Sequence, residues 1–273
     1  MGGMPVLQPF PTQKVDSIDP FLLLHHAQIK VPEHRDPKQL GVGPHPHRGF
    51  SPVTFIYKGG VHHRDSRGND SVIYEGGVQW MNAGMGLIHS ERPPEDIHER
   101  GGIQEIIQLW VNSPKKDKME IPEYFPASKE DIETLIEHSG TVEIDVVCGE
   151  LKGKKGVVSG KSPVNAFNLR LKAGGNTELI IPEDHNSFIY LLEGEIRLNG
   201  FGIIEEKNVI LLNNDGEGVK IEANKESRAL LLSGLPLNEP VVSHGPFVMN
   251  SQTEIMEAMR DYQMGKMGIL IEE

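Results

Sequence analysis

The amino-acid sequence predicts an all-β fold, made of two tandem β-sandwich or barrel domains with short helices. Short runs of β-branched and aromatic residues recur along the chain, glycine-rich turns separate them, and no segment alternates strand patterns with helix patterns. At 273 residues the chain is long enough for two domains of ordinary size. Prolines and mixed charges mark a connection near the middle. We therefore expect an N-terminal domain over residues 1–120 and a C-terminal domain over residues 121–273.

In the first half, the strands follow each other as an antiparallel meander. Val53–Tyr57 is β-branched and aromatic, and the Lys-Gly-Gly sequence at 58–60 is typical of a hairpin turn. The alternating segment 104–111 is expected to be the strand that closes the first domain. Residues 92–100 are charged and contain two prolines, so we expect a loop there, at the mouth of a cavity.

The second half repeats this all-β pattern and ends in a helix. Residues 253–264 place Ile255 and several methionines toward one side of a helix, which Gly265 ends. We expect this helix to pack where the two sandwiches meet. The strands expected before it are 142–147, 165–171, 179–182, 187–192, 195–199, 209–212 and 228–233.

Four side chains that can bind a metal ion stand in two pairs at the ends of one glycine-rich stretch. His45 and His47 form one pair, and His89 and Glu91 form the other. Side chains at positions i and i+2 of a strand leave the same face, so each pair can aim at one point and two facing pairs can enclose one ion. Imidazole with carboxylate suits a divalent first-row transition metal better than Mg²⁺ or Ca²⁺. A single His-x-His arises often by chance among 12 histidines, but two pairs favour a metal site.

The same residues carry a resemblance to a known family. His-x-His followed by a distant Gly-x-Gly-x-x-His resembles the two metal motifs of the cupin superfamily. The longer strings HPHRGF, GGVHHRDSRGN, GGVQWMNAGMGLIHSE and GPFVMN are similar to the pirin family, and the likeness extends over most of the chain. It implies two cupin domains in one chain, with iron bound in the N-terminal one by His45, His47, His89 and Glu91. Pirins usually have a Glu after the Gly-Phe, where this chain has Ser51-Pro52, so the chemistry beside the metal is expected to differ.

Two further histidines lie between the ligand pairs. Because adjacent residues of a strand point to opposite faces, only one of His62 and His63 can face the cavity. We expect His62 to be peripheral and His63 to lie near the ligands, and we assign neither as a ligand. By the same argument, Glu105 and Gln108 cannot share a strand face.

The C-terminal half lacks a comparable set of ligands. His185 stands alone, no His-x-His precedes the strand over 187–192, and residues 209–218 contain no histidine. The sequence therefore predicts a structural or interaction role for the second domain.

Composition excludes several other classes of protein. The formal net charge is −12 and no run of lysine or arginine is longer than two, which argues against direct binding of nucleic acid. No apolar stretch approaches the roughly 20 residues of a membrane span. The single cysteine, Cys148, rules out an internal disulfide framework, and the N-terminus lacks a secretory pattern, so we expect a cytoplasmic protein. Because two fused sandwiches supply the pairing that single cupins obtain by dimerising, we expect a monomer.

The metal site supports more than one kind of function. Pirins resemble cupin quercetinases, in which a flavonol such as quercetin chelates the metal through its 3-hydroxyl and 4-carbonyl and becomes reactive toward O₂. In this reading Glu91 is the candidate base. The alternatives are a metal-binding regulatory protein that acts through a protein partner, with residues 92–100 in the interface, and a metal-dependent isomerase. Iron is expected from the resemblance, while manganese, nickel, copper and zinc also suit such a site.

Overall fold

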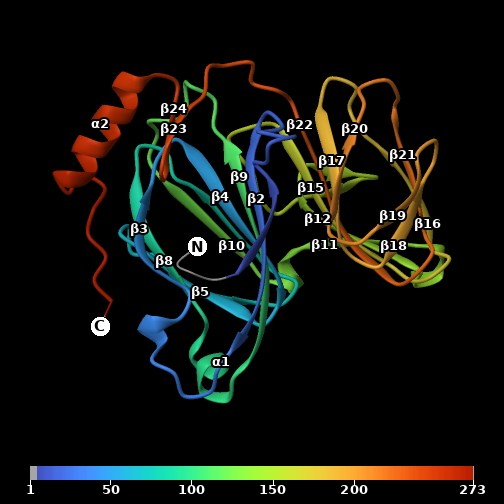
Figure 1. Ribbon diagram of the computed structural model, residues 1–273, viewed down its shortest axis with the longest axis horizontal. Coiled ribbons are helices and arrows are strands. Elements are labelled where there is room, and N and C mark those ends of the chain that lie inside the picture. Colours follow the sequence, from blue (N-terminus) through green and yellow to red (C-terminus); the bar gives the residue numbers. More distant parts are fainter. Residues whose placement is uncertain (1–4, 273) are drawn as a thin grey trace. The chain divides into compact units, whose positions relative to one another are not determined.

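The protein, described from residue 5 to residue 272 by a computed structural model, is built almost entirely from antiparallel β-structure (Figure 1). It forms two compact units. Unit 1 contains Met1–Ser17, Phe21–Glu130 and Leu237–Glu273, and unit 2 contains Ile18–Pro20 and Asp131–Pro236. The all-β prediction is confirmed.

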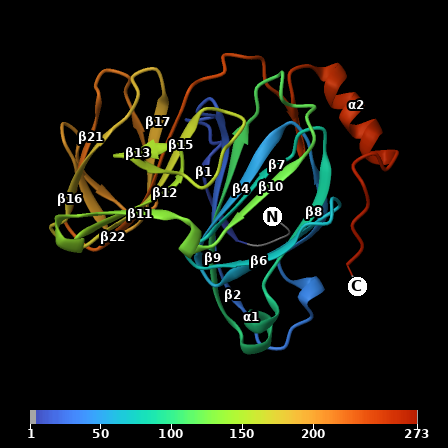
Figure 2. The same cartoon turned by 180° about the vertical axis from the view of Figure 1, so that it is seen from behind.

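Unit 1 combines a six-stranded sheet with a four-stranded sheet (Figures 1 and 2). A cluster of buried apolar side chains from both sheets, including Ile56, Val61 and Ile106, packs between them. The six-stranded sheet has the order β1 (Val6–Phe10), β2 (Phe21–Val31), β9 (Gly102–Asn112), β4 (Phe50–Lys58), β7 (Val78–Asn82), β10 (Glu123–Ala127). The four-stranded sheet has the order β3 (Val42–His47), β8 (Leu87–Arg92), β5 (Gly60–Asp65), β6 (Asp70–Tyr74). A short pair, β23 (Val242–His244) and β24 (Phe247–Met249), completes the strands of this unit.

Unit 2 repeats the same combination of sheets. The six-stranded sheet has the order β11 (Glu133–Glu137), β12 (Val142–Cys148), β15 (Val164–Leu171), β22 (Ser227–Gly234), β17 (Asn186–Glu193), β20 (Asn208–Leu212). The four-stranded sheet has the order β16 (Asn176–Ile180), β21 (Gly218–Ala223), β18 (Glu195–Leu198), β19 (Gly202–Glu205), and β13 (Glu150–Leu151) pairs with β14 (Lys154–Lys155). Alternate residues of neighbouring strands, such as Ile144, Leu169 and Leu231, contribute to one apolar core between the sheets.

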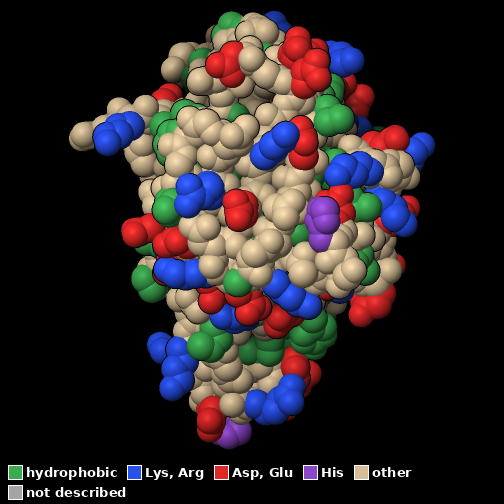
Figure 3. All heavy atoms as spheres, turned by 90° about the vertical axis from the view of Figure 1, so that its right-hand side faces the viewer, with side chains coloured by type: hydrophobic (Ala, Val, Ile, Leu, Met, Phe, Trp, Pro, Cys, Tyr) green, Lys and Arg blue, Asp and Glu red, His purple; other side chains and the backbone are tan. Residues whose placement is uncertain are grey.

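The surface of unit 2 contributes little to holding it together. Basic and acidic side chains are interspersed on the face shown in Figure 3. Ion pairs on the surface of unit 2 include Lys220 with Glu178 and Lys225 with partly exposed Glu195. Exposed pairs of this kind stabilise a fold by about 1 kcal/mol at most. Burial of the apolar core is therefore the main stabilising term for this unit.

The turn after β4 shows why the chain reverses direction at this point. Gly59 has a φ of 77°, a conformation that favours glycine, and a Cβ added there would lie 2.7 Å from the carbonyl oxygen of Ile103. The chain reverses at this point into β5, which brings His62 and His63 into the four-stranded sheet. The predicted turn is confirmed, but the predicted hairpin is wrong, because β4 pairs with β7 and β9 and β5 pairs with β6 and β8.

Short helices connect or follow the strands. They are α1 (Glu95–Arg100), α2 (Gln252–Gln263), and the 3-10 turns η1 (Pro37–Gln39), η2 (Lys129–Asp131) and η3 (His138–Gly140). Residues 92–100 were expected to form a loop, and that expectation is wrong for Glu95–Arg100. The two prolines stand before the helix, acidic residues occupy its first turn, and Arg100 pairs with Asp96 one turn earlier. No helix among the described residues is long and apolar enough to span a membrane.

The C-terminal helix forms as expected, but with a different buried face. Ser251 caps α2 by accepting a hydrogen bond from the backbone N–H of Glu254. Ile255 and Ala258 are buried in a cluster with Phe247, Met249 and Met267. Three methionines of the expected face are instead exposed, namely Met256, Met259 and Met264.

Contacts of the C-terminal segment explain why the two units differ from the predicted division at residues 120 and 121. The guanidinium of Arg48 donates two hydrogen bonds of 3.1 Å to Asp261 on α2. Strand β10 pairs with β7, so residues 123–127 also belong to unit 1. The segment from Leu237 onward therefore groups with unit 1.

Buried Lys118 joins three segments next to the turn between β3 and β4. Its ammonium group donates hydrogen bonds to the carbonyl oxygens of Gly49 (2.6 Å) and Val248 (3.1 Å) and to Oδ1 of Asn112 (2.6 Å). Burial lowers the pKa of Lys118 to about 8, although the carboxylates of Glu239 and Glu254 act in the opposite direction. At pH 7 the group is therefore still charged and satisfies all three acceptors.

We predict that Lys118→Ala lowers the free energy of unfolding by roughly 2–4 kcal/mol, because three buried acceptors lose their donor. Lys116→Ala, which alters an exposed lysine of the same loop, serves as the matched control and should change it by less than about 0.5 kcal/mol. Urea unfolding at pH 7 measures both. Equal stability of the two variants would contradict the assigned role of Lys118.

Candidate metal centre

The antiparallel pairing of β3 with β8 brings the two predicted ligand pairs together. His45 lies directly opposite His89 in the ladder, and His47 lies opposite Leu87. The ring centroids of His45 and His89 are 4.3 Å apart, and that of His47 lies 4.8 Å from His45 and 4.9 Å from His89. One ring nitrogen of each histidine lies within 4.8 Å of the others. The three imidazoles therefore converge on one point, as the spacing predicts.

The nitrogen atoms of these rings are suited to binding a metal ion. His47 and His89 are buried, and His47 Nδ1 and His89 Nε2 are buried atoms without a hydrogen-bond partner. The Nδ1 atom of His45 lies 2.8 Å from the carbonyl oxygen of Gly43, which leaves Nε2 of that ring to a ligand. Buried polar atoms without a partner cost free energy, and a bound metal ion would give these two nitrogen atoms a partner. This donor set fits a divalent transition metal.

Burial also keeps the rings of His47 and His89 neutral. It lowers the pKa of His47 and of His89 well below 6.5, and the positive charge that neighbouring histidines can carry, His45 foremost, lowers both further. The backbone of Pro246 acts in the opposite direction on the pKa of His47. Neutral imidazole is the form that binds metal ions.

Glu91, the fourth predicted ligand, lies on the same side of β8 but outside the histidine cluster. Its side chain lines a small cavity together with His89. Its Oε1 atom accepts a hydrogen bond of 2.6 Å from the hydroxyl of Thr54, and that hydroxyl accepts one of 3.2 Å from Gln108. Among the described residues, the group of converging ligand atoms contains the three histidines and not this carboxylate. The assignment of Glu91 as a ligand stays a prediction.

The residues weighed around the ligand pairs separate by strand face. His63 is buried, and its Nδ1 lies 3.4 Å from Nδ1 of His89, while His62 points away and lies 2.7 Å from Asp70. Gln108 lines the cavity, whereas Glu105 lies 3.1 Å from His26. Alternation along the strands therefore predicts correctly that only one member of each pair faces the cavity, and the expected position of His63 near the ligands is confirmed.

The Ser51-Pro52 departure has a visible consequence. Pro52 lines the cavity where the family usually has a carboxylate nearby, and Ser51 donates a buried hydrogen bond of 2.7 Å to Asn82. This chain therefore places an apolar ring beside His89 and Glu91.

Sequence reasoning missed three of the polar side chains around the site. Thr54 binds Glu91, Tyr124 stacks on the ring of His63 with 4.0 Å between centroids, and Asn69 donates a hydrogen bond of 2.7 Å to Asp65. Thr54 follows the i, i+2 alternation from Pro52 along β4, a pattern that could have placed it on the cavity side. Tyr124 comes from β10, a distant strand, and no local pattern indicates its position.

The cavity next to the ligands has a volume of about 10 Å³, room for a single water molecule. Its lining residues are Pro52, Thr54, His63, Gln79, Met81, His89, Glu91, Gln108 and Tyr124. In unit 2 an apolar core packs between the sheets, and a pocket of about 790 Å³ is lined in part by its residues. His185, also at this pocket, contacts Ser233 instead of a second ligand. Within residues 5–272, the one cluster of three metal-binding side chains lies in unit 1.

We predict that the metal-free protein loses stability as the pH falls below about 6.5. The unfolded chain takes up protons on His47 and His89 near pH 6.5, but the folded chain resists this uptake because both pKa values are lowered, so the free energy of unfolding decreases with falling pH. Urea unfolding of metal-free wild type and of the double variant His47→Gln/His89→Gln, from about pH 8 to about pH 5, measures this effect. The double variant should show a shallower decrease. Identical slopes would contradict burial of two neutral imidazoles.

Comparisons with known proteins agree with the fold. Residues 3–111 match the family model described as Pirin, and residues 166–268 match the Pirin C-terminal cupin domain. A Pseudomonas aeruginosa protein named "Putative quercetin 2,3-dioxygenase PA2418" is 39% identical over 251 residues, which cover 91% of this chain and 86% of that protein. A pirin-like protein of Solanum lycopersicum is 38% identical over 261 residues, which cover 93% and 84%.

A solved structure shows the same architecture. The crystal structure of a quercetin 2,3-dioxygenase from Acinetobacter baumannii superimposes with a TM-score of 0.91 at 38% sequence identity, and covers 99% of this chain and 94% of that one. Its agreement over nearly the full length identifies both units as cupin domains. Together with the family models that match both halves, these likenesses show that the chain belongs to the pirin family.

Proposed function

We propose that this protein is a metal-dependent dioxygenase that holds one Fe²⁺ on His45, His47, His89 and Glu91 and acts on a flavonol such as quercetin. The observation that carries the proposal is the convergence of three imidazoles, two of them with buried nitrogen atoms that lack a partner. The names of relatives at 38–39% identity support the substrate class. A bound Fe²⁺ would acidify a chelated flavonol hydroxyl and supply redox chemistry toward O₂.

The chain's own residues account for the remaining requirements. Burial holds His47 and His89 neutral, which keeps their lone pairs available at physiological pH. The ring of His47 packs edge-on against Phe50 and Trp110, with centroids 5.0 and 5.6 Å away. These apolar contacts exclude water from one side of the centre.

In the proposed reaction, Glu91 accepts the proton of the substrate hydroxyl. Its Oε1 atom is held by Thr54, and its Oε2 atom has no hydrogen-bond partner among the described residues. Oε2 can therefore accept the proton of a flavonol hydroxyl bound beside His89, while the Thr54 contact fixes the orientation of the carboxylate.

The size of the cavity favours a second candidate function. About 10 Å³ cannot enclose a flavonol, because pockets for small organic ligands measure roughly 300 Å³ or more. A flavonol must therefore approach from the side of His45, the partly exposed histidine, or displace lining residues. A metal-binding regulatory protein that acts through a protein partner needs no such space. The predicted interface would then use the exposed residues of α1, since Arg92 is buried in an ion pair of 2.7 Å with Glu272.

We predict that wild-type protein loaded anaerobically with Fe²⁺ consumes O₂ when quercetin is added. His89→Ala should lower the rate by more than about 100-fold, because a ligand is lost and not merely an outer contact to a ligand. His62→Ala serves as the matched control, since His62 lies on β5 but points away from the cluster and should retain the wild-type rate. Iron binding without uptake of O₂ would reject the dioxygenase and favour the regulatory candidate.

Glu91→Gln tests the proton-transfer role. Glutamine keeps an oxygen that can accept the hydrogen bond from Thr54, but it cannot take a proton, so uptake of O₂ should fall by about 10²–10⁴-fold. Fe²⁺ content, measured in the same samples by metal analysis, separates loss of the base from loss of the metal. A variant with full iron content and an unchanged rate would exclude Glu91 as the base.

A further inference from the structure

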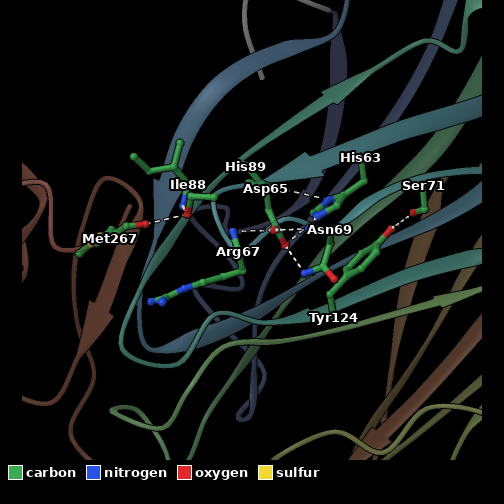
Figure 4. A network of polar contacts seen from close by, with 10 residues as sticks. His63, Asp65, Arg67, Asn69, Ser71, Ile88, His89, Tyr124 and Met267 are labelled. Carbon is green, nitrogen blue, oxygen red and sulfur yellow. Dashed lines mark hydrogen bonds and ion pairs between the residues drawn. The ribbon is translucent and has the colours of Figure 1, made fainter. Parts of the chain in front are cut away.

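A chain of three buried side chains ends on one of the histidines of the cluster (Figure 4). Oδ2 of Asp65 lies 3.3 Å from Nε2 of His63, and Nδ1 of His63 lies 3.4 Å from Nδ1 of His89. Asp65 and His63 are on β5, and His89 is on β8, its neighbour in the four-stranded sheet. Each of the three side chains is at most 4% exposed, so water does not compete for these contacts.

Asp65 is fixed at the far end of this chain. Its Oδ1 atom accepts hydrogen bonds from the backbone N–H groups of Arg67 (2.8 Å) and Asn69 (3.0 Å). Its Oδ2 atom accepts one of 2.7 Å from the side-chain amide of Asn69. These donors hold Asp65 as an ionised carboxylate, which can only accept hydrogen bonds.

The direction of the hydrogen bonds between Asp65, His63 and His89 determines which ring nitrogen carries each proton. Because the carboxylate of Asp65 can only accept, the proton between it and His63 must be on Nε2 of His63. A neutral His63 then has a bare Nδ1, so the proton between the two rings must be on Nδ1 of His89. This leaves the lone pair of His89 on Nε2, the atom without a hydrogen-bond partner.

We propose that Asp65 and His63 are positioning residues that set the tautomer of His89 and thereby direct its Nε2 lone pair to the metal ion. The proposal rests on the metal site proposed above and goes beyond its four ligands. Partners of this kind behind a metal-binding histidine fix its orientation and raise its basicity. Asp65 and His63 themselves do not touch the ion.

The orientation of His63 is also fixed. Its ring stacks on Tyr124, with centroids 4.0 Å apart and an angle of 9° between planes. The hydroxyl of Tyr124 in turn lies 2.7 Å from Oγ of Ser71, which anchors the stacked ring (Figure 4). His63 therefore cannot rotate away from His89 without breaking this stack.

At His45 a single hydrogen bond to the backbone fixes the tautomer. Its Nδ1 lies 2.8 Å from the carbonyl oxygen of Gly43, an acceptor only, so the proton of this ring is on Nδ1 and the lone pair is on Nε2. No carbonyl oxygen takes that place at His89, where Nδ1 faces a second imidazole. An imidazole can donate or accept, so it fixes a tautomer only if its own proton is fixed. Asp65 meets this requirement.

The paired strands β5 and β6 each carry an aspartate that contacts a histidine, and these two aspartates are a matched pair for the test. Asp65 contacts inward-facing His63, and Asp70, on the paired strand β6, contacts outward-facing His62 at 2.7 Å. Asp65→Asn places an amide that can donate to Nε2 of His63, which reverses the chain and puts the proton of His89 on Nε2, where the metal must bind. Asp70→Asn makes the same chemical change on the other face of the sheet.

The affinity of metal-free protein for Co²⁺, measured by competition with a chelator, is the readout. Asp65→Asn should bind Co²⁺ about 10- to 100-fold more weakly than wild type, and Asp70→Asn should match wild type. His63→Phe keeps a ring on Tyr124 but has no nitrogen, and should lose affinity similarly. Combined with Asp65→Asn it should cause little further loss, because both act through one chain. Thermal unfolding of the metal-free variants confirms that each is folded.

The possible outcomes distinguish the positioning role, the metal site and the dioxygenase activity from one another. Equal Co²⁺ affinity of wild type, Asp65→Asn and His63→Phe would overturn the positioning role while leaving the metal site intact. Additive losses in the double variant would show two independent structural effects and would also overturn it. A wild type that binds Co²⁺ no better than His89→Ala would reject the metal site and the positioning role together. Co²⁺ binding with the expected pattern, but no O₂ uptake with Fe²⁺, would reject the dioxygenase alone.

Discussion

The antiparallel register of β3 against β8 is the constraint on which the site depends. It sets His45 opposite His89, and alternation along each strand then places His47 on the same side. A shift by one residue would turn every side chain of a strand to the other face of the sheet. The turn after β3 contributes to this register, because Gly49 adopts a φ of 86° and its carbonyl oxygen is bound by Lys118. Lys118 also donates a hydrogen bond to the carbonyl oxygen of Val248, so packing of the C-terminal segment supports the site built from residues 45–91.

The two units show how one architecture serves different roles. Both combine a six-stranded and a four-stranded sheet. Unit 2 packs apolar side chains, such as Leu169 and Ile221, between its sheets and gains stability from their burial. Unit 1 places imidazoles, a carboxylate and amides in part of the corresponding space. Buried polar groups cost free energy unless they are paired, and the partners found for Glu91 and Asp65 reduce that cost.

Patterns of local origin could be predicted from the sequence, and long-range contacts could not. The i, i+2 spacing identified the histidine cluster, and strand alternation separated His63 from His62. The stack of Tyr124 on His63 joins residues 61 positions apart, so no short motif contains it. The exposed face of α2 was misjudged because burial there depends on β24, which contributes Phe247 and Met249. The return of the chain to unit 1 at Leu237 was missed for the same reason.

Anomalous diffraction from crystals grown with Fe²⁺ tests the central claim most directly, namely that His45, His47, His89 and Glu91 hold one metal ion. We predict a single strong iron peak between the three imidazoles, within about 2.0–2.2 Å of one nitrogen of each ring, with a Glu91 oxygen in contact. A peak that lies elsewhere, or no peak in crystals of protein shown to contain iron, would contradict it. A peak bound by the histidines alone would remove Glu91 from the ligand set and leave its carboxylate to Thr54.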